Sequence, residues 1–243
     1  MIPEQKVDEA KDFFAKILTV FADTKIPFMV GGGFALKEHT GIERDLNDLD
    51  LFCKAGDYPK LLQKAKEAGF KIEVTDDRWI AKVIFKTFIV DIIFNHYLGL
   101  FPVNDCWFRN TKSAEILGIK ANILPPEELI WSKAYRQDRT KYDGPDVYHL
   151  ILKKGGEIDW KNLLNRMEAH WEVLFAHILN FRFIYPSNRN IIPKWLLEEL
   201  VSRFITQMST PPPQEKVSRG PLFSRSQYDV DIKQWGYEFY EES

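Results

Sequence analysis

The hydrophobic pattern divides the chain into a mixed first half and a helical second half. In the first half, apolar residues recur at helical spacing in residues 7–23, 34–39 and 59–68. Short apolar or alternating runs, which are typical of β-strands, occupy residues 26–30, 48–53, 79–85, 88–94 and 118–124. Residues 95–115 show neither pattern. This mixture predicts a small mixed sheet with helices packed against it.

The second half has helical signals only. Pro125-Pro126 followed by Glu127-Glu128 is typical of a helix start, because proline suits the first turn and acids suit the positive end of the dipole. We expect helices at about 126–139, from the Gly144-Pro145 break to Leu152, at 160–185 and at 193–208. Beyond Ser209, the run Pro211-Pro212-Pro213 predicts an extended segment.

These patterns predict an α+β protein in three parts. Residues 1–124 would form an α/β domain and residues 125–208 a helical domain. Residues 209–243 would form an extended tail, and its aromatic end indicates packing on the body or on a partner. The oligomeric state stays open.

Composition narrows the class of protein. The chain has 243 residues, 45% hydrophobic and 28% charged, as is usual for a globular protein. A net charge of −2 gives no bulk signal for nucleic acid, and no apolar run is long enough to span a bilayer. The polar N-terminus is unlike a secretory signal. Two distant cysteines exclude a disulfide framework or cysteine-based zinc site, so we expect a cytoplasmic protein.

Three aspartates carry the chemistry. Asp48 and Asp50 lie two apart on a predicted strand, so their carboxylates would share one face. Asp91 stands alone in the apolar run Phe88–Phe94, where an unpaired carboxylate would cost several kcal/mol. If the two strands are neighbours, three carboxylates converge. Oxygen ligands suit Mg²⁺, and two such ions would support phosphoryl transfer.

A simpler interpretation stays open for these acids. Asp48 and Asp50 could form a solvated strand face, and Asp91 could form an ion pair with a lysine or arginine.

A glycine turn precedes the acids. Gly31-Gly32-Gly33 follows a predicted strand and opens a predicted helix, where backbone N–H groups can hold phosphate oxygens. The turn is neither a Walker loop nor a dinucleotide fingerprint. Alone, three glycines are more often just a tight turn.

The order of these motifs resembles the nucleotidyltransferase superfamily with the DNA polymerase β-like fold. The resemblance rests on Val30–Leu36, His39-Thr40-Gly41, Arg44, Asp48–Leu51 and Val90-Asp91. It implies that Gly32 and Gly33 hold the nucleotide phosphates and that Asp48, Asp50 and Asp91 bind the metals, Mg²⁺ or Mn²⁺. Arg44 matches a frequent arginine of the family, which implies that it could contact phosphate. Gly33 departs from the family, which often has serine there.

The second half adds to this resemblance. Leu124–Lys133 is similar to a helix that follows the catalytic domain in bacterial nucleotidyltransferase-like proteins of unassigned substrate, and this implies that Lys133 faces the triphosphate. By base rate alone, a lysine on a helix is more often a solvated surface charge. Residues 139–150 match the region that follows this helix less closely.

The resemblance implies a metal-dependent enzyme that transfers NMP from an NTP to an unidentified acceptor, which is a small molecule, a tRNA or a protein. Asp91 would be the general base or an acceptor-side ligand. One alternative is a non-catalytic binding protein, or a toxin or antitoxin, on the same fold. A phosphohydrolase or metal nuclease is a third interpretation, but no His–Asp pair accompanies the acids.

Overall fold

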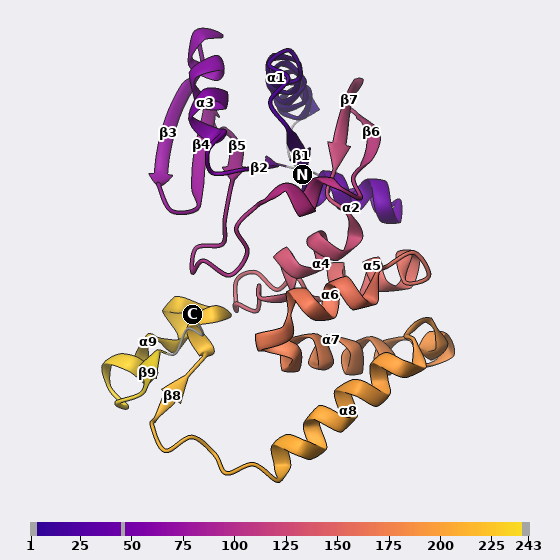
Figure 1. Cartoon of the computed structure of the whole chain (residues 1–243). Helices are drawn as coiled ribbons and strands as arrows, with labels where there is room; N and C mark the ends of the chain where they lie inside the picture. The colour runs from indigo at the N-terminus through magenta and orange to yellow at the C-terminus, as the bar shows by residue number, and fades with distance from the viewer. Residues whose placement is uncertain (1–3, 45–46, 240–243) are drawn as a thin grey trace. The chain divides into compact units, whose positions relative to one another are not determined.

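The computed structural model describes residues 4–44 and 47–239. The chain forms two compact units, Met1–Leu129 and Ile130–Ser243. Helix α4 (Pro126–Ala134) begins in the first unit and ends in the second. Figure 1 shows the strands gathered in the first unit and helices predominating in the second.

The described part of the first unit contains a seven-stranded mixed sheet in the order β3-β4-β5-β2-β1-β7-β6. Its strands are β1 (Phe28–Val30), β2 (Asp48–Cys53), β3 (Lys71–Asp76), β4 (Ile80–Phe85), β5 (Phe88–Ile93), β6 (Lys112–Ile116) and β7 (Ile119–Ile123). Its helices are α1 (Glu4–Ala22), α2 (Gly32–Thr40), α3 (Tyr58–Glu67) and the short 3₁₀ helix η1 (Asp105–Phe108). This is the mixed sheet expected from the sequence.

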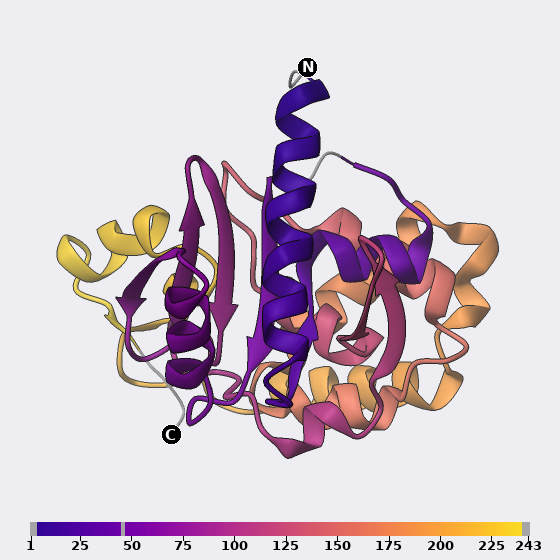
Figure 2. The same cartoon turned by 90° about the horizontal axis from the view of Figure 1, so that it is seen from above.

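Helices α1 and α3 contact each other and pack against the strands, and Figure 2 shows α1 lying along the sheet. Phe14, Ile17 and Leu18 from α1 are fully buried or nearly so. Leu49 and Leu51 of β2 are also fully buried. Because side chains alternate along a strand, this burial leaves the aspartates of β2 on the opposite face.

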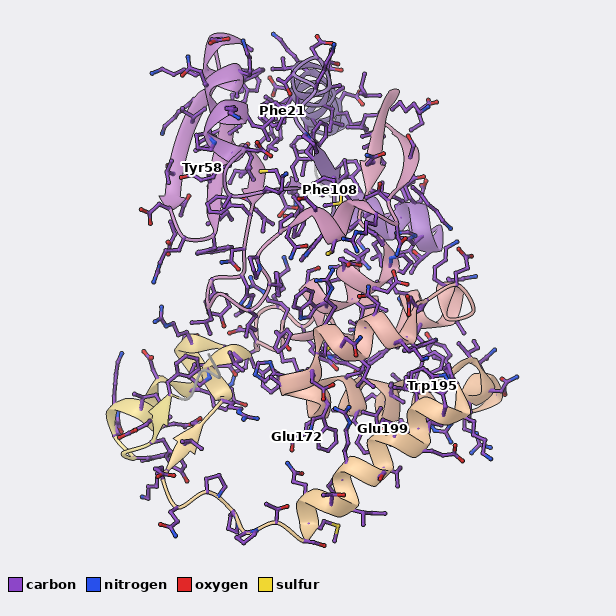
Figure 3. The ribbon with its side chains drawn as sticks, in the orientation of Figure 1. Phe21, Tyr58, Phe108, Glu172, Trp195 and Glu199 are labelled. Atoms are coloured by element: carbon purple, nitrogen blue, oxygen red, sulfur yellow. The ribbon has the colours of Figure 1, made fainter. Side chains whose placement is uncertain are left out.

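Aromatic side chains also tie α3 and the segment after β5 to this unit. The ring of Tyr58, labelled in Figure 3, stacks on Phe94 with centroids 4.1 Å apart. Trp107 is fully buried and stacks on Phe52 of β2. The prediction that residues 95–115 are irregular is therefore wrong in part, because the region contains η1 and most of β6. Its Trp107 packs on the same strand that carries Asp48 and Asp50.

The second unit consists mainly of helices. They are α5 (Gly144–Lys154), α6 (Trp160–Arg166), α7 (Trp171–Ile184), α8 (Lys194–Met208) and α9 (Arg225–Lys233). The 3₁₀ helices η2 (Glu168–His170), η3 (Pro186–Ile191) and η4 (Gly220–Leu222) and the strands β8 (Val217–Ser218) and β9 (Glu238–Phe239) complete it.

The single helix predicted over 160–185 is wrong. The chain leaves helical geometry at Met167, where φ is −105° and ψ is 19°, and α7 begins only at Trp171. The Met167 side chain at this break is fully buried. Neither proline nor glycine marks this point, so periodicity alone could not locate it.

Other differences lie at edges and ends. Strand β3 was not expected; it lies at the edge of the sheet, and most of its residues are exposed. Helix α4 ends at Ala134 rather than near Arg139. The segment after Ser209 contains α9, and Ser224 at its start hydrogen-bonds to the Asp138 carboxylate. None of the described helices is long and apolar enough to cross a membrane.

Replacing Ile17 by alanine tests the packing of α1 on the sheet. We expect Ile17→Ala to lower the free energy of unfolding by about 2–5 kcal/mol, because a fully buried side chain leaves a cavity. Lys11→Ala, on the exposed side of the same helix, is the matched control and should change it by less than about 0.5 kcal/mol. Urea denaturation measures both. Equal effects of the two substitutions would contradict the packing described here.

Candidate active site

The pairing of β2 with β5 brings the predicted acids together. The two strands are parallel and in register, so that Asp50 lies opposite Asp91 and Asp48 lies opposite Ile89. Residues paired in this way project from the same face of a sheet, and Asp48 shares that face because it is two residues from Asp50. Asp50 and Asp91 are half-buried, and Asp48 is exposed.

The glycine turn lies directly against this face. The amide of Gly31 donates a hydrogen bond to the Asp50 carbonyl at 2.9 Å. Gly32 has a φ of +52°, and a β-carbon there would lie 1.8 Å from Oδ2 of Asp50. Only glycine therefore fits between the backbone and this carboxylate. Gly33 follows in the first turn of α2, where helix amides lack intrahelical partners.

The third acid, Asp91, has a lysine side chain next to it. The ammonium of Lys82 on β4 lies 2.9 Å from Oδ1 of Asp91, and the two side chains are only 23% and 17% exposed. Lys82 is also the register partner of Asp91. The ion pair that the sequence left open for Asp91 is therefore present. Lys82 itself was not among the predicted site residues.

The site face carries a row of charged residues across four strands. The register places Glu73 opposite Lys82, Lys82 opposite Asp91 and Asp91 opposite Asp50. The charges along this row are thus negative, positive, negative and negative. Cross-strand neighbours of opposite charge attract, while Asp91 and Asp50 repel each other.

The donor chemistry of this face fits a hard divalent cation. Carboxylate oxygens are the ligands that Mg²⁺ and Mn²⁺ prefer, and Asp48, Asp50 and Asp91 share one face. Within the described residues, no three His, Cys, Asp or Glu side chains gather closely enough to hold a metal ion. The structure thus places suitable carboxylate donors on one face without gathering them around one point. A lysine ammonium lies beside one of these donors, Asp91.

The predicted phosphate contacts fall in different places. Arg44 is exposed and follows α2, next to residues outside the described part of the chain. Lys133 belongs to the second unit and is largely buried. Its ammonium lies 3.2 Å from Asp143 and 2.8 Å from Asp146. The role of both cations toward phosphate stays a prediction.

The carboxylates around Lys133 set its charge. Burial disfavours the charged ammonium, but the attraction of Asp143 and Asp146 outweighs burial, so the pKa of Lys133 is raised above its usual value. The lysine therefore stays protonated at neutral pH. Its two partners lie in the sequence region around Gly144, but no spacing rule identified them as ion-pair partners.

Two further polar groups near the sheet have structural roles. His39 is buried, and its Nε2 lies 2.7 Å from the carbonyl oxygen of Leu124. Cys53 is a free thiol at the end of β2, and burial raises its pKa to about 12. Cys53 is therefore a protonated thiol at neutral pH, and the thiol is the less reactive form of cysteine.

The chain matches a family of nucleotidyl transferases over most of its length. A family model described as "Nucleotidyl transferase of unknown function (DUF2204)" matches residues 10–178, and the chain belongs to this family. The family makes the protein a transferase, and its description leaves the substrate open. No curated protein matches the sequence.

Several solved structures are similar to the chain. The antibiotic-resistance factor ANT(2'')-Ia is 16% identical with a TM-score of 0.48, over 69% of this chain and 95% of that chain. The lincosamide antibiotic adenylyltransferase LnuA is 21% identical with a TM-score of 0.43, over 58% and 94%. JHP933 from Helicobacter pylori is 14% identical with a TM-score of 0.44, over 96% and 100%.

Gly32→Ala tests the contact between the glycine turn and Asp50. Strain at positive φ should lower stability by about 1–3 kcal/mol, and the added methyl group should displace the Asp50 carboxylate. We expect a lower melting temperature together with loss of nucleotide binding. Gly56→Ala, where a β-carbon meets nothing within 4 Å, should behave like the wild type. Unchanged melting and binding in Gly32→Ala would refute this contact.

Lys133→Ala tests the buried ion-pair cluster. Removal of the ammonium leaves two buried carboxylates without their cation, so we expect a loss of about 3–5 kcal/mol in the free energy of unfolding. The measurement is thermal unfolding without nucleotide, with Lys153→Ala on the exposed side of α5 as the control. If Lys133→Ala melted like the control, the cluster would have no structural role.

Proposed function

We propose that this protein transfers a nucleoside monophosphate from an NTP to an acceptor hydroxyl, and that Asp48, Asp50 and Asp91 hold Mg²⁺ or Mn²⁺ for this reaction. The observation that supports the proposal is the in-register pairing of Asp50 with Asp91 directly beside the Gly32 turn. Membership of a nucleotidyl transferase family agrees with it.

The residues of this chain would divide the work as follows. The amides of Gly32 and Gly33 at the start of α2 would bind phosphate oxygens. Asp48 and Asp50 would orient the triphosphate through the bound cation, and Asp50 lies directly against this turn. Arg44 would add positive charge to the phosphates. Lys133 already has two carboxylate partners, so it would have to leave one of them to contact phosphate.

Asp91 would act at the acceptor. Its carboxylate would accept the proton of the attacking hydroxyl or orient that hydroxyl. In the transfer, the acceptor oxygen forms a bond to the α-phosphorus, and the bond from that phosphorus to pyrophosphate breaks. Divalent cations, when bound, would neutralise the triphosphate and lower the pKa of the acceptor hydroxyl.

The acceptor itself is a small molecule, a tRNA or a protein hydroxyl. We place the reaction in the cytoplasm, because Cys53 and Cys106 are both free thiols. Mass spectrometry of cell extract incubated with the protein and each NTP would reveal the acceptor, as a mass increase by one nucleotide monophosphate.

A non-catalytic binding role on the same fold is the second candidate. The ion pair of Asp91 with Lys82 supports it, since this pair neutralises one of the three proposed ligands. Calorimetry with ATP, GTP, CTP and UTP in Mg²⁺ separates the candidates, because a scaffold without a nucleotide site should bind none of them.

Asp48→Asn, Asp50→Asn and Asp91→Asn test the catalytic role. Each should lower NMP transfer by at least about 100-fold, because an amide is a much poorer ligand and base than a carboxylate. Transfer is measured with α-labelled NTP and extract, and the melting temperature shows that each variant is folded. Asp77→Asn, at an exposed turn, should keep full activity. Transfer that survived Asp48→Asn or Asp50→Asn would overturn the metal mechanism.

A further inference from the structure

Lys82 occupies a particular place on the site face. It lies on β4 between β3 and β5, and its two register partners are both acidic: Asp91 on one side and Glu73 on the other. Its ammonium forms an ion pair with Asp91, and both side chains are half-buried. Glu73 is exposed and accepts a hydrogen bond from the Thr75 hydroxyl at 3.3 Å.

A divalent cation held by Asp91 would meet the Lys82 ammonium at close range. Like charges a few Å apart repel each other, and a partly buried position screens this repulsion less than open water does. Lys82 and a divalent cation are therefore competitors for the same carboxylate. Without the cation, the lysine neutralises Asp91 and offsets the repulsion between Asp91 and Asp50.

Glu73 offers the lysine a second position. Directly opposed residues on antiparallel strands have β-carbons about 4.5–5.5 Å apart, which is within reach of a lysine side chain. The four-carbon stem of Lys82 would stay on the same face of the sheet while the ammonium moved from one carboxylate to the other. Such a move would release Asp91 without leaving the lysine unpaired.

We propose that Lys82 is an exchangeable internal counter-ion: it holds Asp91 in the metal-free protein and moves toward Glu73 when a divalent cation binds. Lys82 is thus a positioning residue that sets the metal affinity of the site. This proposal rests on the proposed function, because it assumes that Asp91 is a metal ligand.

The test measures the binding of Mn²⁺ alone to the wild-type chain and to variants. Electron paramagnetic resonance of the free ion monitors the binding. Lys82→Gln should bind Mn²⁺ about tenfold more tightly, because the competing ammonium is gone. Lys82→Arg keeps the charge and should restore affinity close to that of the wild type. Lys120→Gln is the matched control on β7, opposite Glu115, and should leave the affinity unchanged.

A second pair of variants tests the role of Glu73. Glu73→Gln removes the alternative partner of Lys82, so it should weaken Mn²⁺ binding about threefold to tenfold. In the Lys82→Gln background, the same change should have no effect, because Glu73 would act only through the lysine. A general effect of charge on the site would instead give additive changes.

Melting temperatures add a readout that does not depend on activity. In EDTA, Lys82→Gln should melt below the wild type, because Asp91 loses its cation. Saturating Mn²⁺ should raise the melting temperature of Lys82→Gln by more than that of the wild type. A variant that failed to fold would show no cooperative melting, and Glu73→Gln would then carry the comparison: weaker Mn²⁺ binding supports the proposal, and unchanged binding refutes it.

The outcomes separate this proposal from the proposed function. If the wild type binds Mn²⁺ and Lys82→Gln binds it equally or more weakly, the counter-ion role is wrong and the metal site stands. If neither chain binds Mn²⁺, both proposals fail. If Lys82→Gln binds and the wild type does not, the lysine blocks the site even more strongly than proposed. Additive effects of Glu73→Gln and Lys82→Gln would refute the movement toward Glu73.

Discussion

The candidate site depends on one constraint, the parallel and in-register pairing of β2 with β5. Leu49 and Leu51 are fully buried on one face of β2, and Val90 is fully buried on β5. A shift of either strand by one residue would turn these apolar side chains toward the site face and the acids into the core. The hydrophobic core therefore fixes Asp50 beside Asp91 without any bond between the carboxylates themselves.

The same constraint explains why the glycine turn adjoins the acids. Strand β1 pairs with β2 on the other side from β5, so Gly31, which follows Val30, lies beside Asp50 and donates its amide to the Asp50 carbonyl. A β-carbon at Gly32 would collide with that carboxylate. Backbone amides and carboxylates thus come together because the strand order brings them together, which is a property of the sheet and not of a single loop.

Much of the fold and of the candidate site could be predicted from the sequence. The features that were missed have identifiable physical reasons. Strand β2 was predicted with its observed bounds, because strict alternation is the clearest strand signal. Lys82 was missed although a signal existed: Phe85 and Phe88 flank a two-residue turn, and counting back from this hairpin pairs Lys82 with Asp91. The Lys133 cluster and the break at Met167 arise from tertiary packing, which local periodicity does not report.

Two ion-paired lysines, Lys133 and Lys82, show how the surroundings of an ion pair decide its role. Lys133 has two carboxylate partners whose side chains are only 16% and 6% exposed, so moving the ammonium would leave a buried charge uncompensated. Lys82 has one bonded carboxylate, and its other register partner, Glu73, is exposed. Water can solvate Glu73 whether or not the lysine is near it, so the lysine can leave Asp91 at little cost when a divalent cation takes its place there. The arrangement around Lys133 is suited to stabilising the fold. The arrangement around Lys82 is suited to releasing the Asp91 carboxylate to a divalent cation.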